Sequence, residues 1–169
     1  MRTLFLLRHA KSSWSDTQLD DFDRPLNERG IRSAPFIGEI MVARGYRPDL
    51  IISSPAKRAK STSLLVCDVL SASYELRFDN RIYESSPGTL LEVTLAIPND
   101  YSSAMLVGHN PGMEGFIKLL TGDSEQMPTA SLAVIEIDVD SWKNVRPGGG
   151  KLREIIRPKD ELKKKHNGD

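Results

Sequence analysis

Three short apolar runs, each leading directly into basic side chains, constrain the fold of this sequence more than any other feature. The runs, with the residues after them, are Leu4-Phe5-Leu6-Leu7 before Arg8-His9, Leu50-Ile51-Ile52 before Ser53-Ser54-Pro55 and Arg58, and Ala104-Met105-Leu106-Val107 before Gly108-His109. If the runs are parallel strands, their carboxyl ends share one edge of a sheet, where open α/β folds bind ligands. Two histidines and two arginines would then meet in one site, a combination that favours a doubly negative phosphoryl group.

Length and charge predict a single domain in which basic and acidic side chains are equal in number. A chain of 169 residues is most simply one domain, which we expect over residues 1–158, followed by a polar tail over 159–169 that should fray. The chain carries 23 basic and 23 acidic side chains, so its net charge indicates neither nucleic acid nor a membrane surface as partner. Any anion site must therefore be local.

Targeting and redox features point to the cytoplasm. The apolar run after Arg2 is too short for a signal peptide, and no segment approaches the roughly 20 apolar residues that span a bilayer. The single cysteine, Cys67, excludes an internal disulfide and lies in an apolar helical stretch, where we expect it in the core. We therefore expect a cytoplasmic protein.

Strand and helix signals alternate along the chain, which is typical of a parallel sheet covered on both faces. We expect a three-layer α/β/α sandwich with a mostly parallel central sheet. Strands are predicted over residues 3–7, 49–53, 74–78, 104–108, 131–139 and 151–157. Helices are predicted over residues 27–45, from 54 to about 70, from 86 to 97 and from 110 to about 122.

Capping residues mark the helix starts. Asn27 is a typical N-cap, and Ser54-Pro55, Ser86-Pro87 and Asn110-Pro111 each place a capping side chain before a proline. Pro35 lies inside the first predicted helix. Because proline removes an internal hydrogen bond and clashes with the preceding turn, we expect it to kink or restart that helix.

The histidine of the first cluster has the chemistry of a nucleophile. Neutral imidazole attacks phosphorus readily, and neighbouring cations disfavour its protonated form. Arg8 could therefore both clamp a phosphate and keep His9 neutral. Arg58, in the first turn of a helix, could reach back over the strand edge and supply a second two-point guanidinium contact, although a solvated helix arginine is the simpler alternative.

The last of the three clusters is a strand-to-helix junction. His109 could donate a hydrogen bond to a phosphoryl oxygen as negative charge shifts in the transition state, and a capping or core role is its alternative. His166, in the charged tail, is expected to be solvated.

In this order along the chain, the motifs resemble the histidine phosphatase superfamily, also called the phosphoglycerate mutase-like fold. The resemblance is carried by Leu7-Arg8-His9-Ala10, Ser53-Ser54-Pro55-Ala56-Lys57-Arg58-Ala59 and Val107-Gly108-His109-Asn110-Pro111. The short chain, the Arg-His-Ala-Lys start and the segment Asp23-Arg24-Pro25-Leu26-Asn27-Glu28-Arg29-Gly30 are similar to the SixA-type phosphohistidine phosphatases. The resemblance runs from residue 3 to about residue 122.

The resemblance implies a two-step phosphoryl transfer that needs no cofactor and no metal. His9 would form a phosphohistidine intermediate that water then hydrolyses, with Arg8, Arg58 and His109 around the phosphate. Arg24 and Asn27 fall in the loop that approaches this pocket in the family. A loop arginine and a plain helix cap are the alternatives for those two residues.

The resemblance identifies the general acid less decisively than it identifies the nucleophile and the phosphate-binding residues. Many members use a carboxylic acid after the third strand to protonate an ester leaving group, and Glu84 is the best-placed residue. An ordinary surface glutamate before a helix is the alternative. Imidazole leaves more readily than an alkoxide, so Glu84 should matter more for phosphate esters than for phosphohistidine.

Three classes of function remain open from the sequence. The leading one is a metal-independent phosphatase acting on protein phosphohistidine, with small phosphate esters as the nearest alternative substrates, because no insertion is long enough for a substantial lid. The second is a metal-dependent hydrolase that uses His9, His109 and a carboxylate such as Asp16 or Glu84. The third is a non-catalytic phosphate-binding module.

Overall fold

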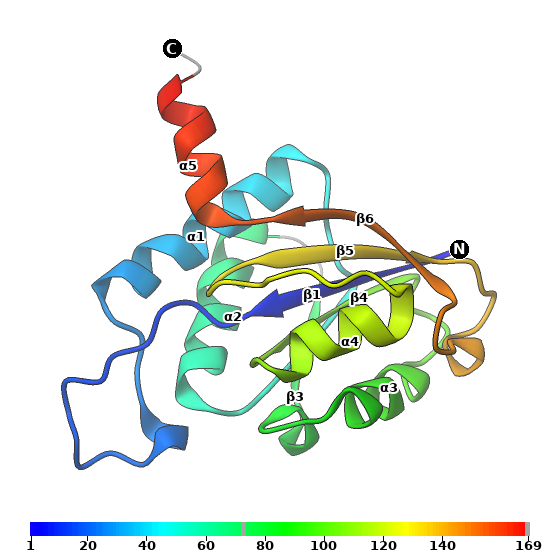
Figure 1. The fold of residues 1–169 in the computed structure, drawn as a ribbon, viewed down its shortest axis with the longest axis horizontal. Coiled ribbons are helices and arrows are strands. Elements are labelled where there is room, and N and C mark those ends of the chain that lie inside the picture. The colour runs from blue at the N-terminus through cyan, green and yellow to red at the C-terminus, as the bar shows by residue number, and fades with distance from the viewer. Residues whose placement is uncertain (72–73, 168–169) are drawn as a thin grey trace.

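A single sheet of six strands forms the centre of the protein. The computed structural model describes residues 1–71 and 74–167 (Figure 1). The strands are β1 (Arg2–Arg8), β2 (Leu50–Ser53), β3 (Glu75–Phe78), β4 (Ser103–Gly108), β5 (Leu132–Ile137) and β6 (Gly150–Ile156). They lie side by side in the order β3-β2-β4-β1-β5-β6. All six strands predicted from the sequence are present, with the predicted 131–139 strand ending at Ile137.

The sheet is mostly parallel, as expected. The pairs β3-β2, β2-β4 and β4-β1 are parallel, while β5 is antiparallel to both β1 and β6, so β5 alone runs against the others. Val107 pairs with Leu7 of β1 and with Ser53 of β2, and Gly108 pairs with Arg8. The carboxyl ends of β1, β2 and β4 therefore end at the same level on one edge.

Helices cover both faces of the sheet, which confirms the three-layer sandwich (Figure 1). The helices are α1 (Glu28–Ala43), α2 (Lys57–Leu70), α3 (Pro87–Leu95), α4 (Gly112–Thr121) and α5 (Pro158–Asn167), with 3-10 turns η1 (Asp21–Asp23), η2 (Asn80–Ile82) and η3 (Trp142–Asn144). Buried residues of α1 and α2 belong to one hydrophobic cluster, and those of α3 and α4 to the other. None of the helices in the described ranges is long and apolar enough to cross a membrane.

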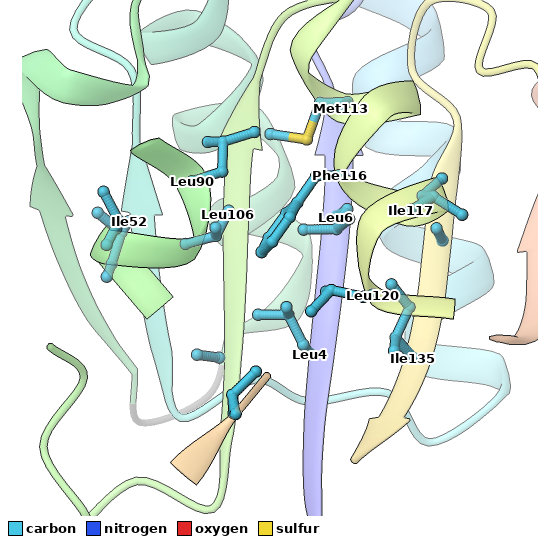
Figure 2. Packing of buried hydrophobic residues seen from close by; sticks show 14 of the residues in the cluster. Leu4, Leu6, Ile52, Leu90, Leu106, Met113, Phe116, Ile117, Leu120 and Ile135 are labelled. Carbon is cyan, nitrogen blue, oxygen red and sulfur yellow. The ribbon is translucent and has the colours of Figure 1, made fainter. Parts of the chain in front are cut away.

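The two clusters arise from the alternation of side chains along β1. Leu4 and Leu6 face α4, where Phe116 packs against them (Figure 2), and Phe5 and Leu7 face the α1 and α2 side. A strand that is apolar at every position is therefore buried on both faces, as the run of leucines and phenylalanine predicted. Cys67 lies in the second cluster as a free, buried thiol, as expected.

Helix starts agree with the sequence in two cases and differ in two others, one of which is α4, where Pro111 and not Asn110 is the N-cap. Asn27 caps α1 by accepting a hydrogen bond from the Gly30 N–H at 2.9 Å, and Ser86 caps α3 by accepting one from Thr89. Helix α2 begins at Lys57 with Ala56 as its N-cap, not at Ser54. The Ser54 hydroxyl instead contacts His109 at 2.8 Å, so the serine belongs to the strand edge.

Two other expectations about helices differ from the structure: α1 does not restart at Pro35, and the tail is helical. Pro35 neither ends nor restarts α1, which runs without interruption from Glu28 to Ala43. The polar tail does not fray over its described part, because residues 159–167 continue α5. Glu161 near the start of α5 forms an ion pair with Arg44 at 3.0 Å, and this contact ties the helix to the body of the protein. His166 is exposed, as expected.

Two leucine substitutions test how the layers contribute to stability. Leu120 of α4 is fully buried (Figure 2), whereas Leu64 of α2 is 44% exposed. We expect Leu120→Ala to lower the free energy of unfolding by about 3 to 5 kcal/mol, because it removes buried contacts and leaves a cavity. Leu64→Ala should cost less than about 1 kcal/mol. Urea denaturation of both variants measures this difference, and equal losses would contradict the assignment of α4 as a core layer.

Candidate active site

The strand edge brings together the basic groups that come after the three apolar runs. His9 comes directly after β1, His109 directly after β4, and Arg58 lies in the first turn of α2. The two imidazole rings lie with their centroids 5.1 Å apart, and both histidines and Arg58 are less than 10% exposed. Arg8, at the end of β1, is near enough to influence both imidazoles electrostatically. We call these four residues, Arg8, His9, Arg58 and His109, the strand-edge site.

The hydrogen bond made by His9 determines which of its nitrogens is free. Its Nδ1 lies 2.7 Å from the carbonyl oxygen of Ala10. A carbonyl oxygen only accepts hydrogen bonds, so Nδ1 carries the proton and donates. In the neutral ring, Nε2 then keeps its lone pair. The first residue after β1 therefore presents an unprotonated nitrogen.

Burial and charge keep His9 neutral. Burial lowers the pKa of His9 to about 3, the hydrogen bond to Ala10 opposes that shift, and His109, Arg58 and Arg8 lower the pKa further by charge repulsion. The sequence predicted the cations as the cause; the structure shows that burial contributes more. His9 is thus unprotonated at neutral pH and available as a nucleophile.

His109 is held by the residue that the sequence placed as a helix cap. Its Nε2 lies 2.8 Å from Ser54 Oγ, and burial together with Arg58 lowers its pKa to about 4. Its Nδ1 is buried and has no hydrogen-bond partner among the described residues. Both imidazoles of the strand-edge site are therefore neutral near pH 7.

Arg58 is held by an acidic residue that the sequence did not single out. Its two terminal nitrogens donate to the Asp21 carbonyl oxygen at 2.6 Å and to Asp21 Oδ2 at 2.9 Å. Oδ2 also accepts a hydrogen bond from the Tyr83 hydroxyl at 2.7 Å, and Tyr83 followed by Arg58 holds the pKa of Asp21 well below its usual range. Asp20, Asp21 and Asp23 form an acidic cluster in the sequence, but nothing there distinguishes Asp21, because it follows no strand.

Arg24 joins the site through the same carboxylate. It donates to Asp21 Oδ1 at 3.0 Å and to Ser12 Oγ at 2.5 Å, and its guanidinium stacks 3.1 Å from the ring centroid of Trp14. Arg24 is 7% exposed, so it is not a solvated loop arginine. The structure places it behind Asp21, where it positions that carboxylate against Arg58.

Arg8 and Asn27 differ in how free their side chains are. Arg8 donates from Nη1 to the Met127 carbonyl oxygen at 3.0 Å, while its Nε is buried with no partner among the described residues. The Asn27 side-chain oxygen is used to cap α1. A phosphate contact by Asn27 stays a prediction, and the cap is the role that its contacts show.

Glu84 lies in a strained loop directly after Tyr83. It is exposed and its φ is 53°, in the left-handed region that costs a non-glycine residue about 1 to 3 kcal/mol. The neighbouring Tyr83 ring lies 5.5 Å from the His109 ring, and a side chain at Gly112 would meet the Ser85 carbonyl oxygen at 2.6 Å. Close packing on α4 thus holds the loop, and Tyr83 brings it against His109. A role for Glu84 as general acid stays a prediction.

The described residues contain no group of three or more His, Cys, Asp and Glu side chains that could hold a metal ion. The charges nearest to His9 are those of Arg8 and Arg58, which would repel a cation. The arrangement is suited to an anion of two or more negative charges, bound by guanidinium groups beside a neutral imidazole.

Fold and site together define an α/β protein with two neutral imidazoles and two arginines at the carboxyl edge of its sheet. Residues 4–114 match the sequence model of the histidine phosphatase superfamily (branch 1). That match spans more than half of the chain. The chain therefore belongs to the histidine phosphatase superfamily, which confirms the resemblance drawn from its motifs.

Individual relatives agree with the family assignment. A candidate phosphohistidine phosphatase SixA from Agrobacterium tumefaciens is 31% identical and superposes with a TM-score of 0.81, over 93% of this chain and 98% of that one. An uncharacterized chloroplastic protein of Arabidopsis thaliana is 33% identical over 93% of this chain and 78% of its own. A protein histidine phosphatase SixA complexed with tungstate shares the fold, with a TM-score of 0.82 at 18% identity over 94% and 99%.

The lowered pKa values predict a loss of stability in mild acid. Folded His9 and His109 have pKa values of about 3 and 4, against 6.5 for a free imidazole. Between these limits the unfolded chain binds protons that the folded chain does not, so the free energy of unfolding should fall as the pH drops from about 6.5 to about 4.

Nitrogen NMR shifts of the imidazoles measure the titration directly. The His9 signal, assigned by its absence in His9→Gln, should stay that of the Nδ1-protonated neutral ring down to about pH 4. A His9 midpoint near the free value would contradict the buried, hydrogen-bonded geometry.

Proposed function

We propose that this member of the histidine phosphatase superfamily removes phosphate from protein phosphohistidine, without a metal ion, through a phosphohistidine intermediate on His9. The observation that carries the proposal is the state of His9: its Nδ1 donates to Ala10, and burial with two arginines lowers its pKa to about 3. A free Nε2 beside two guanidinium groups is the arrangement that nucleophilic attack on a phosphoryl dianion requires.

In the first step the Nε2 lone pair of His9 attacks phosphorus. A new N–P bond forms as the bond between phosphorus and the substrate imidazole breaks, and that imidazole leaves with the electron pair. If its other nitrogen carries no proton, it takes one from solvent. Arg8 and Arg58 bind the phosphoryl oxygens, and His109 donates to the oxygen that gains charge. The phosphorylated His9 ring keeps its Nδ1–H on the Ala10 carbonyl.

In the second step water attacks the phosphorus of phosphorylated His9. The oxygen of water bonds to phosphorus, the N–P bond breaks, and its electron pair returns to Nε2. Both protons of water stay with the product, which leaves as dihydrogen phosphate and then exchanges protons with solvent. Neutral His9 is restored, in the same tautomer, because the Ala10 carbonyl never releases its hydrogen bond.

A phosphatase of small phosphate esters is the second candidate, and one observation favours it. Glu84 follows Tyr83, whose ring lies 5.5 Å from the His109 ring, and its strained left-handed backbone supports a functional position. An alkoxide needs a proton when it leaves, whereas imidazole has a conjugate acid near neutrality. How far turnover depends on Glu84 should therefore differ between phosphate esters and phosphohistidine.

Glu84→Gln distinguishes the two candidates. We expect turnover of an alkyl phosphate to fall about 100-fold or more, as the loss of a general acid predicts, and turnover of a phosphohistidine peptide to fall far less. Glu92→Gln, at an exposed position of α3, is the matched control and should change neither. Equal losses on both substrates would show that Glu84 does not act through the leaving group.

Covalent catalysis by His9 is tested with a radiolabelled phosphohistidine peptide. A brief pulse should leave acid-labile label on the protein, because N-linked phosphate hydrolyses in acid. His9→Ala should take up none, whereas His166→Ala, at an exposed position of α5, should label normally. Label that persists in His9→Ala would place the nucleophile elsewhere, and no label in the native protein would favour a non-catalytic phosphate-binding module.

Metal independence has its own test. Turnover should survive prolonged treatment with a chelator and be blocked by vanadate, which binds where a phosphoryl group is transferred. Loss of activity in chelator, with recovery on adding a divalent cation, would favour the metal-dependent hydrolase.

We place the protein in the cytoplasm, which the buried free thiol of Cys67 supports because it is compatible with a reducing compartment.

A further inference from the structure

A basic groove opens beside the strand-edge site. It has a volume of about 720 Å³ and lies between α1, the segment before β5 and the start of α5. Figure 1 shows α1 and α5 side by side at this end of the sheet. The cations that line it are Arg8, Lys11, Arg29, Arg32, Arg157 and Lys159, and the only carboxylate among its lining residues is that of Asp160.

The concentration of positive charge is local. The whole chain has equal numbers of basic and acidic side chains, so a groove with six cations and one carboxylate is a strong departure from the average surface. Charges of one sign along a hollow focus the field and raise the local concentration of an anionic partner.

Four of the six cations have no partner in the described part of the chain. Arg157 is paired with Glu125, and Arg8 donates to Met127. The side chains of the other cations make no ion pair and no hydrogen bond with any residue in the described ranges; these are Lys11, Arg29, Arg32 and Lys159. All four are exposed, so they are free to bind an external anion.

The groove is continuous with the strand-edge site through Arg8. This arginine lines the groove and also lies near enough to His9 to lower its pKa by charge. Between the cations the lining includes the apolar side chains of Phe36, Pro128 and Leu162. Of the strand-edge site, Arg8 lines the groove, so a ligand that reaches past Arg8 from His9 would meet apolar surface flanked by positive charge.

We propose that this groove docks an acidic segment of the substrate protein, next to the phosphorylated residue in the chain. The inference rests on the proposed function and names the chemistry of its partner. Exposed lysines and arginines spread over two helices suit a chain of spaced carboxylates, because each makes a single contact along its length. The apolar lining suits the methylene groups and apolar side chains of a peptide.

The same features disfavour the other polyanions. A compact polyphosphate is best held by buried guanidinium forks that converge on one point, whereas Arg29, Arg32 and Lys159 are exposed and spread along the groove. Single-stranded nucleic acid binds to rows of aromatic side chains, and Phe36 is the only aromatic residue of the lining.

Binding of unphosphorylated peptides tests the groove without any catalytic step. A fluorescent peptide with a run of glutamates should bind, weaken as salt rises, and bind at least about tenfold more tightly than the same peptide with glutamines. Arg29→Glu with Arg32→Glu should remove that preference. Lys118→Glu with Lys143→Glu, at exposed positions on α4 and η3, makes the same change in net charge and should preserve it.

Turnover then links the groove to the substrate. With a phosphohistidine whose peptide carries flanking glutamates, the Arg29/Arg32 variant should lose about tenfold in kcat/KM, mainly through a higher KM. Its turnover of phosphoramidate, a small substrate without a peptide, should stay within about twofold of the native value. Thermal unfolding of the variant checks its fold, and glutamate near the start of α1 is favourable to the helix.

Each other binding result overturns the proposal. No preference for the acidic peptide in the native protein would show that the groove is not a docking site. Tighter binding of a single-stranded oligonucleotide or of tripolyphosphate than of the peptide would assign it to a different polyanion. If the glutamate peptide binds as expected but no phosphohistidine substrate is hydrolysed, the proposed function is wrong. The assignment of the groove as a binding site for acidic peptides then still holds.

Discussion

The parallel pairing of β1 with β4 is the constraint on which the rest of the site depends. It sets Arg8 opposite Gly108, and the next residue of each strand is a histidine. The His9 N–H donates to the Gly108 carbonyl oxygen at 3.0 Å, which extends the ladder into the site. A shift of one residue in this register would turn every side chain of β1 to the other face and separate the imidazoles. The buried leucines of β1 therefore fix the chemistry as well as the core.

Much of this was accessible from the sequence because the end of each strand is marked by a change from apolar to basic residues. An apolar run before Arg8-His9 or Gly108-His109 gives both the strand and the group at its carboxyl end, and parallel topology then brings the groups together. Ser54 was identified, but as a helix cap. Its hydroxyl could serve α2 or the facing histidine, and only the position of His109 decides between them.

Neither the role of Asp21 nor the basic groove could be predicted from the sequence, and the reason is a different one. Asp21 acts through contacts with Arg58, Arg24 and Tyr83, and two of those partners lie 37 and 62 positions away in the chain. The groove collects cations from α1 and α5, and the sequence alone predicted a frayed tail where α5 forms. Sequence periodicity reports which face of an element is buried. It does not report which exposed side chains of two distant helices share a surface.

The charges around His9 oppose its protonation, and in the proposed mechanism the same charges would favour a phosphoryl group on this ring. A proton on Nε2 would add a positive charge beside Arg8, Arg58 and His109 in a buried site, and the low pKa of His9 reflects that cost. A phosphoryl group on the same nitrogen also makes the ring cationic, but it brings two negative charges to the two guanidinium groups. The same arginines that disfavour the imidazolium would thus stabilise the proposed phosphoimidazole. Asp21 and Met127 hold the two arginines in place: the Asp21 carboxylate pairs with Arg58, and the Met127 carbonyl oxygen accepts a hydrogen bond from Arg8. The buried Nε of Arg8 has no partner in the described part of the chain.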